Sequence, residues 1–490
     1  LDFRGRAYPI PPHLSNIGSD LNRGLLTFQN SKPLGVNGLF WLKVHLANLF
    51  GMDKTSFPDR AQFTEDHLPQ IRASITDPLG EAWWKSAEDP FQALATCFEI
   101  CDALDSGDPS TFESSLPVHM DGSCNALQHY AAIGRDRVGG HAVNLCNADE
   151  PQDVYTGVMK KVIEIVANDA KLLDNNDSYT DHKASGTKFT KDDSTNTTTN
   201  QNNNTASKED GDEQETGDYL TTKEMETIRH SRSFDFDDVK KYEAAKLVNG
   251  LIDRGVVKRT VMTSVYGVTF IGAKNQIREK IEEKLEEQGH DIYLLDREIH
   301  LASGYLAKIT MEVIGELFSG ARQTMNWLTT CARLLSAEGQ PVAWITPIGI
   351  PVVQPYRQKK AFSVVTMFQS IRLVTRSDHL PIHKGRQASA FPPNYVHSLD
   401  SAHMMLTALE MEKRNLDFTA VHDSFWTHAG NIDEMNEILR DSFVDLYDGD
   451  VLEDLRESWK LRYPDIELPD LPERGDLDIK DVKDSTYFFQ

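Results

Sequence analysis

The chain has 490 residues, 39% of them hydrophobic and 26% charged, which is enough for a large core and more than one subdomain. No apolar run approaches the roughly eighteen residues that a membrane-spanning helix needs, so the sequence predicts no membrane span. The formal net charge of −24 weakens the case for a nucleic-acid enzyme without excluding one, because phosphate binding needs Lys and Arg.

The first third of the chain is predicted to combine a loop region, helices and one short strand. Residues 1–30 are rich in Gly, Pro and Arg, which favours an ordered loop region over a long helix. The segment Leu116–Asp121 (LPVHMD) is typical of a short strand. Apolar residues at helical spacing predict four helices: Gly38–Phe50, Pro90–Leu104, Asn125–Gly134 and Val154–Ala170.

The middle of the chain changes composition abruptly. Every residue of Ser194–Ser207 except Ala206 is Ser, Thr, Asn or Gln, so the stretch cannot bury enough apolar area to order itself. We therefore expect a disordered insertion at about 172–220. Residues 172–240 hold 16 acidic and 8 basic side chains, and residues 431–490 hold 18 and 7. Most of the negative excess lies in these two stretches, so a cationic cleft elsewhere is compatible with the composition.

Order is predicted to resume near Phe234. A single helix is expected over Lys240–Gly267, followed by helices at 275–288 and 295–319. Val342–Val353 and Phe418–Ala429 are each predicted to form a β-hairpin, the second with His422, Asp423 and Ser424 at its bend. The pattern indicates an α+β protein that is mainly helical.

The five cysteines include no C-x-x-C pair, which argues against a disulfide framework or a zinc ribbon and favours a reducing compartment. The chain begins at Leu1 rather than at a methionine, and we expect it to be a fragment of a longer protein.

Two aspartates are candidate metal ligands because each lies at a predicted strand end among small or polar residues. Asp121 is followed by Gly122, whose carbonyl is a further candidate ligand, and Asp423 precedes Ser424. Mg²⁺ takes few protein carboxylates and completes its shell with water and phosphate, so two aspartates suffice for a two-metal phosphoryl-transfer site. The alternative is that each aspartate caps a turn or a helix, which is its commoner role beside Gly or Ser.

A cationic stripe is predicted on the helix that ends near Tyr266. Arg254, Lys258, Met262 and Tyr266 are spaced four apart, so they share one helix face suited to a triphosphate and a base or sugar. The alternative is a solvated basic face with a tyrosine in the core. Weaker signals come from Asp2–Arg6 (DFRGR), where two arginines suit phosphate contact, and from a histidine in Pro392–Asp400 (PPNYVHSLD).

Five segments, taken together and in order, resemble the motifs of single-subunit RNA polymerases of bacteriophages, mitochondria and chloroplasts. They are LDFRGRAYPIP, HMDGSCNALQHYAA, RGVVKRTVMTSVYG, PPNYVHSLDSAH and AVHDSFWTH. The resemblance implies a right-hand polymerase fold, with palm and fingers and a small antiparallel palm sheet. It implies a palm with the template-contacting loop over 1–171, the insertion over 172–220, fingers over 221–340, and the rest of the palm over 341–490.

The resemblance also implies a role for each motif residue. Asp121 and Asp423 match the two metal-binding aspartates. Lys258 and Arg254 match the fingers-helix residues that contact the incoming triphosphate, with Lys258 taking part in catalysis. Tyr266 and His397 match residues that contact the sugar of the incoming nucleotide. The residues that match contacts with the template and the RNA–DNA hybrid are Arg4, Arg6 and Gly267.

The implied function is template-dependent addition of ribonucleoside triphosphates to an RNA 3′ end on a DNA template, with two Mg²⁺ ions. The Asn/Thr tract favours an enzyme of the mitochondrial matrix, fungal rather than phage, and the resemblance implies a mitochondrial transcription factor as a partner of missing regions. Three alternatives stay open. The first is a related DNA polymerase, although such enzymes commonly have phenylalanine at the Tyr266 position. The others are a non-catalytic nucleic-acid-binding derivative and an acidic helical protein whose motifs are coincidental.

Overall fold

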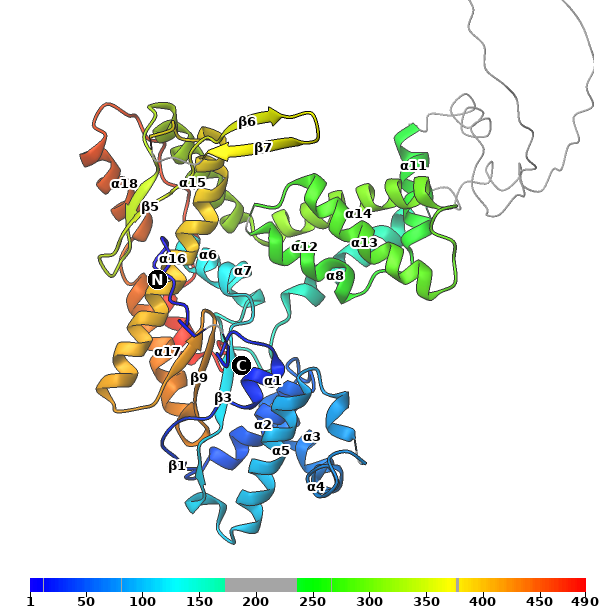
Figure 1. Cartoon of the computed structure of the whole chain (residues 1–490), viewed down its shortest axis with the longest axis vertical. Helices are drawn as coiled ribbons and strands as arrows, with labels where there is room; N and C mark the ends of the chain where they lie inside the picture. Colours follow the sequence, from blue (N-terminus) through cyan, green and yellow to red (C-terminus); the bar gives the residue numbers. More distant parts are fainter. Residues whose placement is uncertain (12, 81, 172–235, 266, 376–378) are drawn as a thin grey trace, which may run out of the picture. The chain divides into compact units, whose positions relative to one another are not determined.

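The computed structural model describes residues 1–171, 236–375 and 379–490, except residues 12, 81 and 266 (Figure 1). The predicted insertion at 172–220 and Tyr266 lie outside the described residues. Contacts divide the chain into two compact units. Unit 1 comprises Leu1–Val158, Val261–Thr269 and Met311–Gln490, and unit 2 comprises Met159–Thr260 and Phe270–Thr310. Residues 311–340, predicted to belong to the fingers, fall in unit 1 of this division, and the palm-and-fingers boundaries stay a prediction.

Unit 1 holds a three-stranded antiparallel sheet that carries both candidate metal aspartates. Its order is β3 (Pro117–Asp121), β9 (Ser424–His428) and β8 (Thr419–Val421). In β3 the side chains of Val118 and Met120 are buried, whereas Asp121 at the strand end is exposed, as the alternation of a strand requires. The strand and the hairpin predicted at these positions are confirmed.

Helices surround this sheet. Helix α2 (Gly38–Leu49) contacts β3, and α17 (Ile432–Tyr447) contacts β9 (Figure 1). Helix α16 (Lys384–Lys413) packs against α6 (Asn125–Gly134), α15 (Ser319–Ala337) and α17. The described residues of unit 1 also form α1 (Asp20–Gly24), α3 (Phe57–Asp66), α4 (Leu68–Thr76), α5 (Pro90–Asp105), α7 (Arg137–Ala142) and α18 (Val451–Arg462). The predicted helices at 38–50, 90–104 and 125–134 are confirmed.

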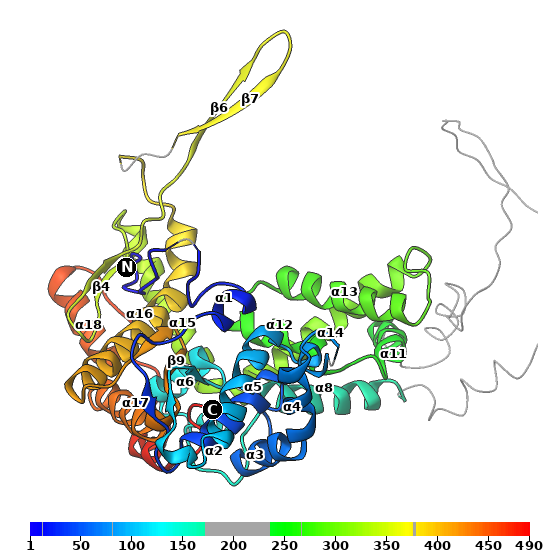
Figure 2. The same ribbon diagram turned by 60° about the horizontal axis from the view of Figure 1, so that its bottom comes forward.

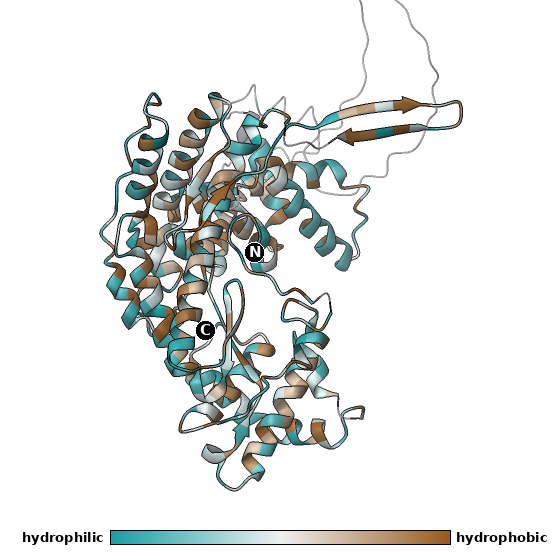
Figure 3. Ribbon diagram, turned by 60° about the vertical axis from the view of Figure 1, so that its left-hand side comes forward, coloured by the Kyte–Doolittle hydropathy of each residue, from teal (hydrophilic) through white to brown (hydrophobic). Residues whose placement is uncertain are grey.

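Among its described residues, unit 1 has three further sheets, each of two strands. They are β1 (Lys32–Pro33) with β2 (Glu113–Ser114), β4 (Ala343–Ile345) with β5 (Pro351–Val353), and β6 (Lys360–Val365) with β7 (Ser370–Thr375). The β4–β5 pair confirms the hairpin predicted at 342–353. The β6–β7 hairpin was not predicted; it projects from the rest of unit 1 (Figure 2) and is largely apolar (Figure 3).

Unit 2 contains α11 (Phe236–Val248) and α13 (Phe270–Glu287), and three helices cross the boundary between the units: α8 (Val154–Asp169), α12 (Arg254–Ser264) and α14 (Asp296–Leu317). Ile277, Ile281 and Leu285 recur at intervals of four along α13 and are buried, which defines its apolar face. Throughout the described residues, each helix is either too short or too polar to cross a bilayer.

The single helix expected over Lys240–Gly267 is wrong. The structure has two helices there, and α11 ends at Val248 before α12 begins at Arg254. Gly250 has a φ of +91°, a conformation that glycine adopts readily and that stops a helix. Asp253 then starts α12 by accepting a hydrogen bond from the Val256 N–H at 3.0 Å.

Candidate active site

The sheet brings Asp121 and Asp423 to the same place, although the sequence separates them by about three hundred residues. Asp121 is the last residue of β3 and pairs with Ser424, the first residue of β9. Asp423 immediately precedes Ser424, and its carbonyl accepts a hydrogen bond from the Gly122 N–H at 3.0 Å. Both carboxylates therefore lie at one end of the sheet, and both residues are exposed.

The two carboxylates repel each other's negative charge. The pKa of Asp423 is raised to about 7 by dense packing around the carboxyl, and then by the charges of Asp400 and Asp121. The pKa of Asp121 is also raised, mainly because protein atoms displace water around it, although a hydrogen bond with Ser424 opposes the rise. Both groups reach solvent on one side, so their charge is available to a cation. This end of the sheet favours binding of a cation.

A two-residue turn holds Asp423 in place. Val421 pairs with Ser424, so His422 and Asp423 alone connect β8 to β9. His422 has a φ of +56°, which costs about 1 kcal/mol for a residue with a Cβ atom. Its ring contacts the ring of Tyr8 edge-on, with centroids 4.8 Å apart. The strain lies next to a candidate ligand, where such strain is commonly found.

The loop Asp2–Arg6 is fixed to α16 by a buried ion pair. Arg6 donates through Nη2 to Asp400 at 2.6 Å, and Asn125 donates to the other Asp400 oxygen, also at 2.6 Å. The pKa of Asp400 lies below its ordinary value. Burial by itself would raise it, but the charge of Arg6 and these hydrogen bonds outweigh that effect. Asp400 is thus an ionised anchor for the loop rather than a candidate proton carrier.

His397 lies one turn before Asp400 on α16 and contacts Arg4. Nη1 of Arg4 lies 2.8 Å from Nδ1 of His397. The pKa of His397 is lowered to about 3 by burial and by the charges of Arg6 and Arg4, so the ring is neutral. Because a guanidinium only donates, Nδ1 accepts and the ring proton is on Nε2. The structure therefore gives His397 the form that donates a hydrogen bond through Nε2.

Gly122 is tightly enclosed beside Asp121. A Cβ atom at this position would lie 3.0 Å from Oε1 of Gln128 and 3.4 Å from the ring of Phe489. The amide of Gln128 is held by hydrogen bonds to the carbonyls of Val143 and Phe488, each at 3.0 Å. The absence of a side chain therefore lets the backbone after Asp121 pass between these groups.

The cationic helix α12 belongs partly to unit 2. Val256, Val257 and Thr260 form its buried face, Lys258 is exposed and Arg254 is half-buried. Because unit 2 contains Arg254 and Lys258, their approach to the two aspartates stays a prediction. Gly267, in unit 1, has a φ of +76°, and its N–H donates a hydrogen bond of 3.1 Å to the Ser264 carbonyl.

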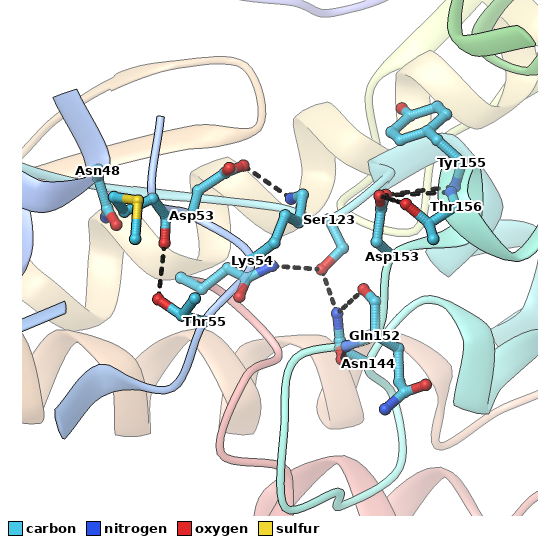
Figure 4. Close-up of polar contacts among 12 residues, drawn as sticks. Asn48, Asp53, Lys54, Thr55, Ser123, Asn144, Gln152, Asp153, Tyr155 and Thr156 are labelled. Carbon is cyan, nitrogen blue, oxygen red and sulfur yellow. Dashed lines mark hydrogen bonds and ion pairs between the residues drawn. The ribbon is translucent and has the colours of Figure 1, made fainter. Parts of the chain in front are cut away.

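A polar cluster beside Ser123 was missed in the sequence. Figure 4 shows it, with Asp53, Lys54, Ser123 and Asn144 among its members. Lys54 pairs with Asp53 at 2.7 Å, Asn144 donates to Ser123 at 2.5 Å, and the charge of Asp53 raises the pKa of Asp121. An isolated Asp-Lys pair after a helix carries no sequence signal that distinguishes it from an ordinary surface turn.

The available ligands fit a magnesium site in which the protein supplies only one or two carboxylates. In the part of the chain that the structure describes, no three His, Cys, Asp or Glu side chains gather as a metal-binding group. Mg²⁺ is commonly bound through one or two carboxylates, with water and substrate phosphates as the other ligands. The paired oxygens of Asp121 and Asp423, with a backbone carbonyl such as that of Gly122, match this chemistry.

Comparison with known proteins is consistent with these motifs. The family described as DNA-dependent RNA polymerase matches residues 32–468. The chain is 43% identical over 494 residues to DNA-directed RNA polymerase 1B, mitochondrial, of Nicotiana tabacum, covering 100% of this chain and 42% of that protein. It is 43% identical over 492 residues to DNA-directed RNA polymerase 2, chloroplastic/mitochondrial, of Arabidopsis thaliana, with the same coverage. The chain spans about two fifths of the length of these relatives, which are plant proteins; the expected fungal origin stays a prediction.

Proposed function

This chain belongs to the single-subunit, phage-type family of DNA-dependent RNA polymerases, and from that premise we propose that it carries the centre that adds ribonucleotides to RNA. The reaction is addition of the next templated ribonucleoside triphosphate to an RNA 3′ end, with release of pyrophosphate. The observation that carries the proposal is the pair of exposed, mutually repelling carboxylates at one end of the β3–β9–β8 sheet.

Asp121 and Asp423 would hold two Mg²⁺ ions, with the Gly122 carbonyl as a further ligand. Bound there, the ions would lower the pKa of the RNA 3′-hydroxyl and neutralise charge on the leaving pyrophosphate. The protein contributes the fixed position of both carboxylates, one on a paired strand and the other on a two-residue turn. Burial raises the pKa of Asp423 most, and repulsion by Asp400 and Asp121 adds to the rise. A cation offsets that repulsion, so binding is favoured most when both groups are ionised.

The residues of the Asp2–Arg6 loop and α16 would contact nucleic acid and the incoming sugar. Arg4 contacts His397, and the neutral ring of His397 donates through Nε2, which suits a ribose hydroxyl. Arg6 donates to Asp400 through both Nε and Nη2, so it holds the loop in place as well as supplying positive charge for the template–transcript hybrid.

The remaining contacts are assigned through the family. Arg254 and Lys258 would bind the triphosphate, Lys258 would neutralise charge on the phosphates during transfer, and Tyr266 would select ribose over deoxyribose. Gly267 would lie near the nucleic acid. Arg254, Lys258 and Met262 are spaced four apart along α12, which supports the assignment of the two cations; the helix ends at Ser264, before Tyr266. The palm-and-fingers arrangement, the mitochondrial matrix and a transcription-factor partner belong to the same proposal.

The test is extension of a preassembled RNA–DNA scaffold by the full-length protein. Addition of the one ribonucleotide that the template specifies, dependent on Mg²⁺ and slower with the matching deoxynucleotide, is the expected result. Asp423→Asn should reduce the rate at least about 1,000-fold. Asp417→Asn is the matched control, because Asp417 pairs with Lys32 away from the turn, and it should extend normally. Preferred incorporation of deoxynucleotides, or extension by Asp423→Asn at the wild-type rate, would contradict the proposal.

A further inference from the structure

One arginine outside the site described above is completely buried. Arg60, in the first turn of α3, has 0% of its surface exposed. Its guanidinium donates four hydrogen bonds, to the carbonyls of Thr55 at 2.9 Å and Asp53 at 3.0 Å, to Oδ1 of Asn48 at 2.9 Å and to Oε1 of Gln490 at 2.8 Å. All four acceptors are uncharged.

Such an arrangement is costly, because a buried charge is normally retained with an opposite charge beside it. Within the described residues no carboxylate lies at ion-pair distance from Arg60. The more distant charge of Asp53 favours the ionised guanidinium, and the ring of Phe57 at 4.9 Å adds a cation–π contact. An apolar side chain would fill the same space at less cost. An apolar residue could not link two segments, one around residue 54 and one at residue 490, as the planar guanidinium of Arg60 does.

The first of these segments carries the Asp53–Lys54 pair. The two carbonyls that accept from Arg60 belong to Asp53 and Thr55, so the guanidinium fixes the backbone on both sides of Lys54. Lys54 pairs with Asp53, and the charge of Asp53 acts on Asp121. The position of this loop therefore affects the electrostatics of a candidate metal ligand.

The second segment lies against Asp121 itself. Strand β3 is at the edge of its sheet, and Gln490 pairs with Asp121 along the open edge through two backbone hydrogen bonds of 3.0 Å, one in each direction. Phe489 forms the adjoining bridge to Gly122, and the Gln490 side chain reaches Ser123 at 3.4 Å. Asp121 is thus held between β9 on one side and the Phe489–Gln490 segment on the other.

We propose that Arg60 is a positioning residue for the metal site, which fixes Asp121 through Gln490 and fixes the Asp53–Lys54 pair through the carbonyls on either side of Lys54. The inference rests on the proposed function, because it assumes that Asp121 binds a metal ion. Loss of the guanidinium lets both segments move and loosens the fixed geometry that a hard cation requires. Lysine cannot replace it, because an ammonium lacks the planar fork that reaches all four acceptors.

The test compares metal binding with stability in five variants. Mn²⁺, a spectroscopic substitute for Mg²⁺, is titrated without nucleotides and followed by electron paramagnetic resonance, and thermal unfolding is recorded for each protein. Arg60→Gln and Arg60→Lys should raise the Mn²⁺ dissociation constant about tenfold, the lower end for a residue that supports a metal ligand. Arg440→Gln is the matched control: Arg440 donates to the carbonyls of Ser485 and Thr486, so it anchors the neighbouring segment without touching Gln490. It should lose stability and keep the wild-type dissociation constant.

Gln490→Ala provides the fourth variant and covers the case in which the Arg60 variants do not fold. It leaves the arginine in place, removes its link to the Asp121 edge, and should weaken Mn²⁺ binding in the same direction. Wild-type affinity in every folded variant of Arg60 and in Gln490→Ala would overturn the inference, as would equal weakening in Arg440→Gln. Asp121→Asn separates this failure from failure of the proposed function. If this variant binds Mn²⁺ as well as wild type does, the metal site itself is wrong. If only this variant binds Mn²⁺ more weakly, the role of Arg60 alone is rejected.

Discussion

Replacing Asp423 with asparagine should make the metal-free protein more stable while removing its activity. The pKa of Asp423 is raised to about 7 from an ordinary value of 3.8, which corresponds to about 4 kcal/mol of unfavourable interaction for the ionised carboxylate. Solvent reaches this side chain and reduces both the cost of burial and the repulsion, so we expect about 1–2 kcal/mol of added stability in the variant. Unfolding entropy is about 2.1 cal/mol/K per residue, so for a unit as large as the one that holds Asp423 this is a rise in Tm of about 1–3 °C.

The assay is thermal unfolding at pH 8 with and without Mg²⁺. Without the ion the asparagine variant should unfold at the higher temperature. Saturating Mg²⁺ should stabilise the wild type by about 2.7 kcal/mol at one hundred times the dissociation constant, and the variant much less, so the order of stability reverses. A metal-free variant no more stable than wild type, or equal stabilisation of both proteins by Mg²⁺, would refute the reasoning.

The same variant has a characteristic pH dependence. Because the folded protein holds the Asp423 proton more tightly than the unfolded chain does, the cost of burying the ionised carboxylate and its repulsion by Asp400 and Asp121 are absent below about pH 3.8 and complete above about pH 7. The difference in Tm between variant and wild type without metal should therefore grow as pH rises, and at pH 5 it should be less than half its value at pH 8. A constant difference over this range would assign the gain in stability to a cause other than the carboxylate charge.

Substitutions at three further positions, Gly122, His422 and Asp400, test the surroundings of the site. Gly122→Ala places a Cβ atom 3.0 Å from Oε1 of Gln128, so thermal unfolding should show a loss of about 1–3 kcal/mol and scaffold extension should slow; unchanged stability would show that the neighbours give way. His422→Gly should change the free energy of unfolding by less than about 1 kcal/mol, because relief of the +56° φ offsets the greater chain entropy of glycine. His422→Val should lose about 1–2 kcal/mol, because a β-branched residue adopts this φ poorly. Equal effects of the two substitutions would mean that the turn is not strained. Asp400→Ala leaves the Arg6 charge without its buried partner and should lose about 3–5 kcal/mol, much of it recovered in the double variant with Arg6→Met; no recovery would assign the loss to packing rather than to charge.

The secondary structure around the metal site could be predicted because its signals are local. From Val118 onward strand β3 alternates buried and more accessible residues and ends at Asp121, and the β8–β9 hairpin turns at polar residues between apolar runs. The two elements pair, and this places the two aspartates at one sheet end, as the motif order had led us to expect. The approach of Lys258 to that end remains a prediction.

Other features were not predictable because they depend on distant contacts or act against local preference. Gly250 breaks a helix that the apolar pattern alone would continue. Helix α16 runs through Pro392 and Pro393, where proline normally ends a helix, and so the placement of His397 on a long buried helix had no local signal. The contact between Arg60 and Gln490 joins residues 430 positions apart, and nothing in the sequence around either residue indicates the other.

The most direct test of a shared metal site is the rate of single-nucleotide addition on a preassembled scaffold by Asp121→Asn, Asp423→Asn and the double variant. If both carboxylates hold the same pair of ions, each single variant loses at least about 1,000-fold in rate, and the double variant is little slower than the slower single one, because the residues act as a unit. Losses that multiply in the double variant, or a single variant that adds nucleotides at nearly the wild-type rate, would contradict a site built from both aspartates.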